Sequence, residues 1–272
     1  PLEAMLEAGR YFLNKQGKSP GVPEEELIKV AVKSMGLDDV SEFDPEKKII
    51  EYQFEERLGP LAKMTIQRFA NELSMETPTP GGGSVAALAG ALAAALTSMV
   101  ANLTVGKKEY LEVTEPMKEI ALKAQRLKDE LLRDVDKDTQ AFNKVMAAFG
   151  LPKTTDEQIQ QRNRAIQEAT RGAALVPLEV MKKSLEVLEL SQQVAQKGNV
   201  NALSDAGVSA LMARTAAEGA SFNVRINLKS IEEKNFVEQL STEAAQLLSL
   251  AKIAERKVLD IVESKLAANS NQ

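Results

Sequence analysis

The stretch Pro78-Thr79-Pro80-Gly81-Gly82-Gly83-Ser84 runs directly into Val85–Leu103, a segment made almost wholly of small and apolar residues. The two prolines stiffen the approach, and the three glycines leave no Cβ atoms in the turn. We predict that Ser84 is the N-cap of a helix whose first backbone N–H groups point outward unpaired. Such a helix start can hold an anion or the polar edge of a ligand, although a plain capped loop explains the same residues.

The predicted helix over Val85–Leu103 approaches the ~20 apolar residues that span a bilayer. Three polar residues, Thr97, Ser98 and Asn102, interrupt it, and alanine contributes little to membrane insertion. Because small residues let helices approach closely, we predict a central helix of a protein core or a subunit interface, with no membrane association. No signal peptide is visible, so the expected location is cytoplasmic.

The composition favours helices over sheets. The chain has 272 residues, 44% of them hydrophobic and 27% charged, with 4% aromatic residues and no Trp. Its net charge of −5 argues against a general nucleic-acid binder. It contains neither Cys nor His, which excludes disulfides, thiolate chemistry and the commonest general base and metal ligand. Any acid–base chemistry must therefore use Asp, Glu, Lys, Tyr or water.

Residues 1–54 differ in character from the rest of the chain. A short helix is predicted over Leu2–Asn14, and a second opens at Pro23, where three acidic residues follow the proline. Lys48–Phe54 alternates like a strand, but these residues offer it no partner strand. We interpret residues 1–54 as the tail of a domain whose body is missing, with residues 55–60 as the junction.

From Leu61 onward the pattern is helical nearly throughout. The predicted helices cover residues 61–75, 84–105, 114–149, 155–197, 201–228 and 233–267. Pro177 should kink or divide the fourth of these helices. About six long amphipathic segments with short connections predict an all-α bundle over residues 61–272.

The helix predicted over residues 114–149 carries Asp138 in the middle of an apolar stripe. The stripe is formed by residues three and four apart: Ile120, Ala124, Leu127, Leu131, Val135, Phe142 and Val145. Asp134 lies near its edge, while Asp136 and Lys137 project toward the opposite face. An unpaired carboxylate in an apolar groove costs on the order of several kcal/mol, so Asp138 should be paired, protonated or open to a cleft. A raised pKa would suit an acid–base catalyst, and a buried salt bridge is the alternative.

The helix predicted over residues 201–228 has a second polar face. If the segment is helical throughout, the face consists of Asp205, Ser209, Met212, Ala216, Asn223 and Asn227. Asp and Asn are poor interior helix residues, so they indicate either a polar binding site or a hydrogen-bond network between helices. Lys107, Lys108 and Lys153, near segment ends, either bind carboxylates or are simply solvated.

Four motifs, in order and at compatible spacings, resemble those of formimidoyltetrahydrofolate cyclodeaminase. They are Pro78–Ala86, Asp138-Thr139-Gln140-Ala141-Phe142, Gly198-Asn199 with Ser204-Asp205, and Asn223-Val224-Arg225-Ile226-Asn227-Leu228-Lys229. This resemblance covers residues 61–267. Ser19–Glu26, Phe43-Asp44-Pro45 and Ile49–Tyr52 resemble the end of glutamate formimidoyltransferase, so residues 1–54 are interpreted as a helix-helix-strand remnant of that α/β domain. Together the segments resemble the C-terminal part of a bifunctional formimidoyltransferase-cyclodeaminase.

The resemblance implies an all-α enzyme that converts 5-formimidoyltetrahydrofolate to 5,10-methenyltetrahydrofolate and releases ammonia, in histidine degradation and one-carbon metabolism. It implies a homodimer, or a larger oligomer built from dimers, with a folate crevice at or near the subunit interface. By similarity Asp138 is the acid–base residue. The implied folate-binding residues are Pro80, Gly81, Gly82, Gly83, Ser84, Asn199, Asp205, Asn223 and Asn227, with Lys107 and Lys108 meeting the glutamate or polyglutamate tail. No cofactor beyond the tetrahydrofolate substrate, no metal ion and no nucleic acid is expected.

Two alternatives stay open on sequence alone. A methenyltetrahydrofolate cyclohydrolase passes through the same kind of tetrahedral carbon, so the motifs do not separate the two activities. A non-catalytic helical scaffold would use the glycine loop and the polar stripes structurally. Formimidoyl transfer itself is not expected, since the tail alone offers no site for it.

Overall fold

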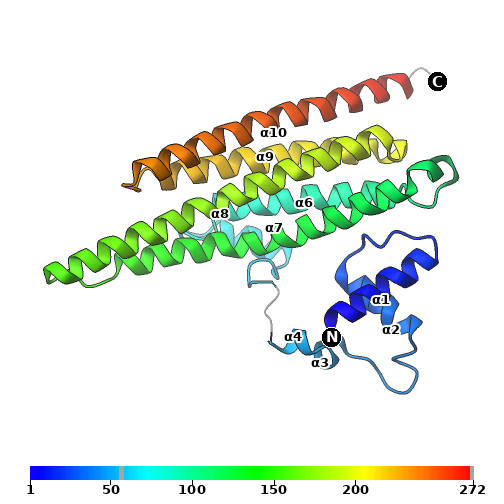
Figure 1. Ribbon diagram of the computed structural model, residues 1–272, viewed down its shortest axis with the longest axis horizontal. Helices are drawn as coiled ribbons and strands as arrows, with labels where there is room; N and C mark the ends of the chain where they lie inside the picture. Colours follow the sequence, from blue (N-terminus) through cyan, green and yellow to red (C-terminus); the bar gives the residue numbers. More distant parts are fainter. Residues whose placement is uncertain (55–57, 270–272) are drawn as a thin grey trace.

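The computed structural model describes residues 1–54 and 58–269 (Figure 1). The described residues contain no strand, and the predicted all-α class is confirmed. Five long helices form the bundle: α6 (Gly82–Asn102), α7 (Thr114–Phe149), α8 (Asp156–Lys197), α9 (Leu203–Leu228) and α10 (Lys234–Asn269). The first predicted bundle helix is shorter than expected and forms α5 (Ile66–Leu73). Two 3-10 turns, η1 (Lys108–Val113) and η2 (Val200–Ala202), lie in the connections.

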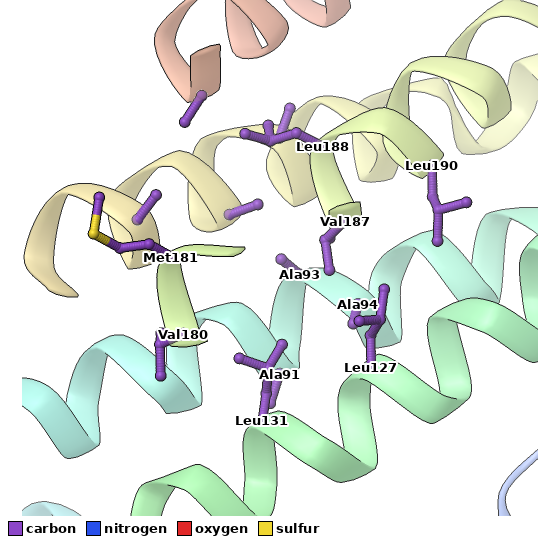
Figure 2. Packing of buried hydrophobic residues seen from close by; sticks show 14 of the residues in the cluster. Ala91, Ala93, Ala94, Leu127, Leu131, Val180, Met181, Val187, Leu188 and Leu190 are labelled. Atoms are coloured by element: carbon purple, nitrogen blue, oxygen red, sulfur yellow. The ribbon is translucent and has the colours of Figure 1, made fainter. Parts of the chain in front are cut away.

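The alanine-rich α6 packs against α7, α8 and α9. All of its alanines except Ala95 are buried, and Figure 2 shows Ala91 and Ala94 beside Leu131 and Leu127 of α7. Small side chains allow this close approach of helices because little volume separates the backbones. By length and composition α6 could cross a membrane, but 67% of its most apolar window is buried inside the bundle. It is a core helix, as predicted.

Helix α8 begins with a capping box, in which Thr155 and Gln158 satisfy each other's backbone N–H groups. It then runs without a break through Pro177 to Lys197. Of the two outcomes predicted for Pro177, a kink or a division of the helix, the division does not occur. The reason lies on α9: Asn227 Nδ2 donates to the carbonyl oxygen of Ala173, 2.8 Å away, which is the acceptor that Pro177 leaves without its helical donor.

The first 54 residues form α1 (Leu2–Lys15), α2 (Glu24–Ser34), α3 (Pro45–Lys48) and α4 (Ile50–Phe54) around a small core of their own. The strand predicted over Lys48–Phe54 is wrong, because these residues have no strand to pair with and instead form helical turns. Asp44 caps α3 by accepting from Glu46 N. Ile49 is buried between the turns, and the Tyr52 hydroxyl donates to Glu24 Oε1 of α2.

Hydrogen bonds to Gly21 help to join this N-terminal piece to the bundle. The carbonyl oxygen of Gly21 accepts from Ser98 Oγ at 3.1 Å and from Asn102 Nδ2 at 2.8 Å, both on α6. A Cβ atom on Gly21 would overlap Ala121 of α7, so only glycine fits there. The predicted junction, residues 55–60, lies partly outside the described residues. Immediately after it, the backbone N–H groups of Leu61 and Ala62 donate to the carboxylate of Asp136.

Asp136 does point away from the stripe that carries Asp138, as predicted. It is nevertheless buried, because the chain around Leu61 covers it. Gly59 lies so close to its carboxylate that a side chain at position 59 would collide with it. Asp136 is thus a structural clamp on the segment that enters the bundle.

Candidate active site

The glycine turn places the start of α6 against α7. Gly81 is the N-cap and Gly82 the first helical residue, so Ser84 lies inside the first turn and the prediction that it is the cap is wrong. Ser84 is fully buried, and its hydroxyl lies 2.9 Å from the carbonyl oxygen of Val135 and 3.1 Å from Asp138 Oδ2. Its side chain therefore reaches across to α7 instead of folding back on its own helix.

Asp138 meets α6 at Gly83 and Ser84. A Cβ atom on Gly83 would overlap the Asp138 carboxylate, whereas one on Gly82 would come no nearer than 3.7 Å to any other group, Asn223 Nδ2. The three glycines are therefore not equivalent. Gly83 makes room for the carboxylate, and the neighbouring exposed Gly82 leaves the turn open to solvent.

The environment of Asp138 favours its protonated form. Burial raises the pKa of the Asp138 carboxyl, and the hydroxyl and backbone N–H of Ser84 lower that pKa by less. No cation pairs with Asp138 within the described residues, so the salt bridge considered from the sequence is not the explanation. A half-buried carboxyl with a raised pKa is suited to accept a proton and return it during a reaction.

Asp134 is the carboxylate that is salt-bridged. It is almost completely buried, 2.8 Å from Lys137 Nζ and 2.5 Å from Lys183 Nζ of α8. Sequence reasoning placed Asp134 at the edge of the stripe but missed Lys183. A lysine one helix away in sequence carries no local pattern that would reveal such a pairing. The pair joins α7 to α8 one turn below Asp138.

Two asparagines of α9 lie at the same end of the bundle. Asn223 is half-buried beside Gly82, and its Nδ2 donates to Gly219 O within α9 at 2.9 Å. Asn227, one turn further on, uses its Nδ2 for the Ala173 carbonyl of α8. Asn223 thus stands beside the glycine turn, while the amide of Asn227 is engaged in joining helices.

Four of the predicted site residues lie at the opposite end of the bundle. They are Lys107, Lys108, Asn199 and Asp205, near the end of α6 and the start of α9. Along the 21 residues of α6 the separation from Gly82 is about 30 Å. Asn199 donates from its backbone to Thr104 Oγ1 and from Nδ2 to Leu103 O, and its Oδ1 accepts from Asn201 N. It connects α6 to η2, whereas Lys108 is exposed.

Pro80 is buried behind the glycine turn. Lys153, considered as a carboxylate ligand, lies exposed in the turn between α7 and α8. Across the residues that the structure describes, no three His, Cys, Asp or Glu side chains converge as a metal site would require. Within one chain, the predicted site residues that lie near one another at this end of the bundle are Asp138, Ser84, Asn223 and the glycine turn.

Comparison with known proteins places this arrangement in a family. The family model described as Formiminotransferase-cyclodeaminase matches residues 65–246, which include Asp138 and the glycine turn. The chain belongs to the formiminotransferase-cyclodeaminase family. A second family model, the formiminotransferase domain, matches residues 1–55.

Members of the formiminotransferase-cyclodeaminase family resemble the chain over different lengths. The rat formimidoyltransferase-cyclodeaminase is 35% identical over 268 residues, which is 97% of this chain and 49% of the rat protein. This chain thus spans about half the length of its bifunctional relatives. A methenyltetrahydrofolate cyclohydrolase from Methylorubrum extorquens is 42% identical over 202 residues, covering 74% of this chain and 97% of that protein.

A solved structure shares the fold. The crystal structure of formiminotetrahydrofolate cyclodeaminase from Thermotoga maritima superposes with a TM-score of 0.68 at 29% sequence identity. The match covers 75% of this chain and 98% of the Thermotoga chain. The helical bundle is therefore the shared cyclodeaminase fold.

Proposed function

We propose that the bundle converts 5-formimidoyltetrahydrofolate to 5,10-methenyltetrahydrofolate and releases ammonia. The observation that carries this proposal is the half-buried Asp138 carboxyl, held against Gly83 and Ser84 with its pKa raised and no cation beside it. Membership of the family and the names of the rat and Thermotoga relatives support the choice of substrate.

The reaction needs one proton to travel from N10 to the departing nitrogen. N10 attacks the carbon of the protonated formimidoyl group, which closes a five-membered ring and leaves a tetrahedral carbon between N5 and N10. The Asp138 carboxylate takes the N10 proton and then gives it to the amino group, which departs as ammonia as the N5 lone pair forms the C=N bond. Both reacting ends belong to one bound molecule, so orientation contributes much of the rate. Proton transfer by a positioned carboxyl adds ~10² to 10⁴-fold.

The glycine turn and Asn223 complete the chemistry at this end. The backbone N–H groups of Gly82 and Gly83 at the start of α6 and the Asn223 side chain lie beside the same turn, and we assign them to the folate. We place the reaction in the cytoplasm and in histidine degradation. We propose that residues 1–54 alone do not carry the transferase activity of the family.

The test of this function is an assay of purified protein with 5-formimidoyltetrahydrofolate, following methenyl absorbance and released ammonia together. Asp138→Asn is the variant that removes the proton carrier with little change in shape. Formation of both products by the wild type, lost in Asp138→Asn, supports the proposal. Products formed equally by both proteins would overturn the role of Asp138, and no products from either would leave the scaffold interpretation.

A methenyltetrahydrofolate cyclohydrolase is the second candidate, because the Methylorubrum relative with that name is 42% identical to this chain. Water would add to the methenyl carbon, Asp138 would take its proton, and the ring would open. The assay repeated with 5,10-methenyltetrahydrofolate separates the two functions: loss of methenyl absorbance, with no ammonia released from the formimidoyl substrate, identifies the cyclohydrolase.

We further propose that two copies pair through the outer face of α6 and α9, and that each folate site uses both copies. The face carries apolar side chains that are 37% to 57% exposed: Val85, Leu92, Met99, Leu103, Val208, Leu211, Phe222 and Ile226. A two-fold axis repeats one patch on both partners. We place this two-fold axis near Leu92 and Leu211, midway along the face. The end of the bundle that carries Asp138 in one copy would then lie against the end that carries Lys107 and Asp205 in the other copy.

This pairing accounts for the separation of the predicted site residues within one chain. It also opposes unlike charges, because Asp205 in the first turn of α9 and Arg225 in its last turns would meet across the axis. Lys107 and Lys108 would then be available to the glutamate tail of a folate bound at the partner's Asp138.

Mixing inactive variants tests the shared site. Asp138→Asn and Asp205→Asn, inactive alone, should together recover roughly a quarter of wild-type activity, since half of randomly mixed dimers carry one intact site. The control pairs Asp138→Asn with Gly83→Ala, two changes at the same end, which should recover nothing. If the first mixture also stays inactive while the wild type is a dimer, the site is confined to one chain.

A further inference from the structure

Pro177 removes a backbone hydrogen bond from the middle of α8. In a regular helix the N–H of residue 177 would donate to the carbonyl oxygen of Ala173, but proline has no N–H. Ala173 and Pro177 are both buried, so water does not readily reach this carbonyl. A buried carbonyl without a donor costs free energy, and structures normally supply one.

The donor comes from another helix. Asn227 Nδ2 lies 2.8 Å from the Ala173 oxygen and is a half-buried group of the last turns of α9. A side chain of α9 thus replaces the missing link in α8. This explains why α8 continues through the proline, and it gives Asn227 a role other than the folate contact that the motif implies.

The bond lies at the end of the bundle that carries Asp138. Gly172 and Val176 of α8 line the same cavity as Lys137 and Ala141 of α7, which flank Asp138 in sequence. On the α9 side, Asn223 precedes Asn227 by one turn and faces the glycine turn of α6. The Asn227 bond therefore fixes the distance between α8 and the part of α9 that presents Asn223.

We propose that Asn227 is a positioning residue for the reaction: its amide substitutes for the helix bond that Pro177 removes, and so holds Asn223 and the glycine turn in register with Asp138. The inference rests on the proposed function of the site. It predicts a dependence between two residues that are distant in sequence. Asn227 should matter only while residue 177 is a proline.

The experiment is a double-mutant cycle with Asn227→Ala and Pro177→Ala, measured by thermal unfolding and by kcat and KM for the formimidoyl substrate. In the wild-type background Asn227→Ala should lower Tm, because the Ala173 carbonyl is left without a donor. It should also lower kcat roughly ten-fold, which is the factor that corresponds to the free energy of about one hydrogen bond. In the Pro177→Ala background the new N–H donates to Ala173, and the same change should cost less than about two-fold in kcat. Alanine is the better helix former, so the Pro177→Ala protein should fold.

Asn223→Ala is the matched control, since that asparagine lies one turn away and donates within α9 to Gly219. Its effect should be the same in both backgrounds. Equal loss from Asn227→Ala in both backgrounds, appearing in KM, would overturn the inference and make Asn227 a direct folate ligand. The unfolding cycle needs no substrate, so coupling in Tm without wild-type activity would mean that the bond exists and the proposed function fails.

Discussion

The Cα of Gly83 faces the carboxylate of Asp138 so closely that a methyl group on Gly83 would overlap it. The contact joins the first turn of α6 to the middle of α7, two segments 55 residues apart in sequence. The position of Asp138, the proposed proton carrier, therefore depends on a residue that has no side chain.

Gly83→Ala should therefore displace Asp138 and lower kcat by about 10²-fold, since an error of about 1 Å in a reacting group has a cost of that order. Gly82→Ala is the matched control, because a Cβ there meets nothing nearer than 3.7 Å. Steady-state kinetics of both variants, with circular dichroism to verify folding, check the prediction. Similar losses in both would mean that the turn acts through its backbone flexibility instead.

Ser84 should lower the pH at which Asp138, the proposed acid–base residue, loses its proton. Its hydroxyl lowers the pKa of the Asp138 carboxyl against the larger effect of burial. Ser84→Ala removes that donor, so the pKa should rise and the acidic limb of the kcat/KM profile should move to higher pH.

The pH profile of Thr139→Val provides the control for this prediction. Thr139 Oγ1 lies 3.4 Å from Ser84 Oγ and is not among the groups that shift Asp138. A limb that moves equally in both variants, or that does not move in Ser84→Ala, would contradict the assigned role of the hydroxyl.

Much of the bundle could be predicted from the sequence, because helix signals are local. The third bundle helix was expected at residues 114–149 and is observed at Thr114–Phe149, where an apolar stripe runs along the helix on either side of Asp138. The alternation of Lys48–Phe54 misled the strand prediction, since a strand needs a neighbour that no local pattern supplies.

The site was only partly predictable, for the same reason. A polar residue on an apolar stripe drew attention to Asp138, and the motif agreed. The contact with Gly83, the pairing of Asp134 with Lys183 and the clamp of Asp136 on Leu61 each join residues far apart in sequence. Side-chain periodicity within one helix does not show which residue of a neighbouring helix contacts a given side chain.

Asp138 should reduce the stability of the folded protein at neutral pH. Burial raises its folded-state pKa above the ordinary value of 3.8, so the folded state holds the proton more tightly than the unfolded chain does. Stability is then lost as pH rises from about 3.8 through the folded pKa. Asp138→Asn cannot ionise and should raise Tm at pH 7, with the gain shrinking toward pH 4. A gain in Tm that is independent of pH would point to packing instead of ionisation.

The Gly21 contact should decide whether the N-terminal piece stays docked on the bundle. Its carbonyl accepts from Ser98 and Asn102, and any Cβ at position 21 would overlap Ala121. Gly21→Val should therefore release residues 1–54 and expose the junction to proteases. Limited proteolysis followed by mass spectrometry would detect the cut, and Lys18→Val, at an exposed position of the same loop, is the control.

Release of the N-terminal piece should leave the chemistry intact. The Methylorubrum relative matches 74% of this chain with 97% of its own length, so this relative has no counterpart to about a quarter of the chain. The Gly21→Val protein should keep kcat within about two-fold of the wild type, because surface contacts remote from a site act weakly on it. A large loss of kcat with an intact bundle would instead show that docking at Gly21 is transmitted along α6 to Gly83 and Asp138.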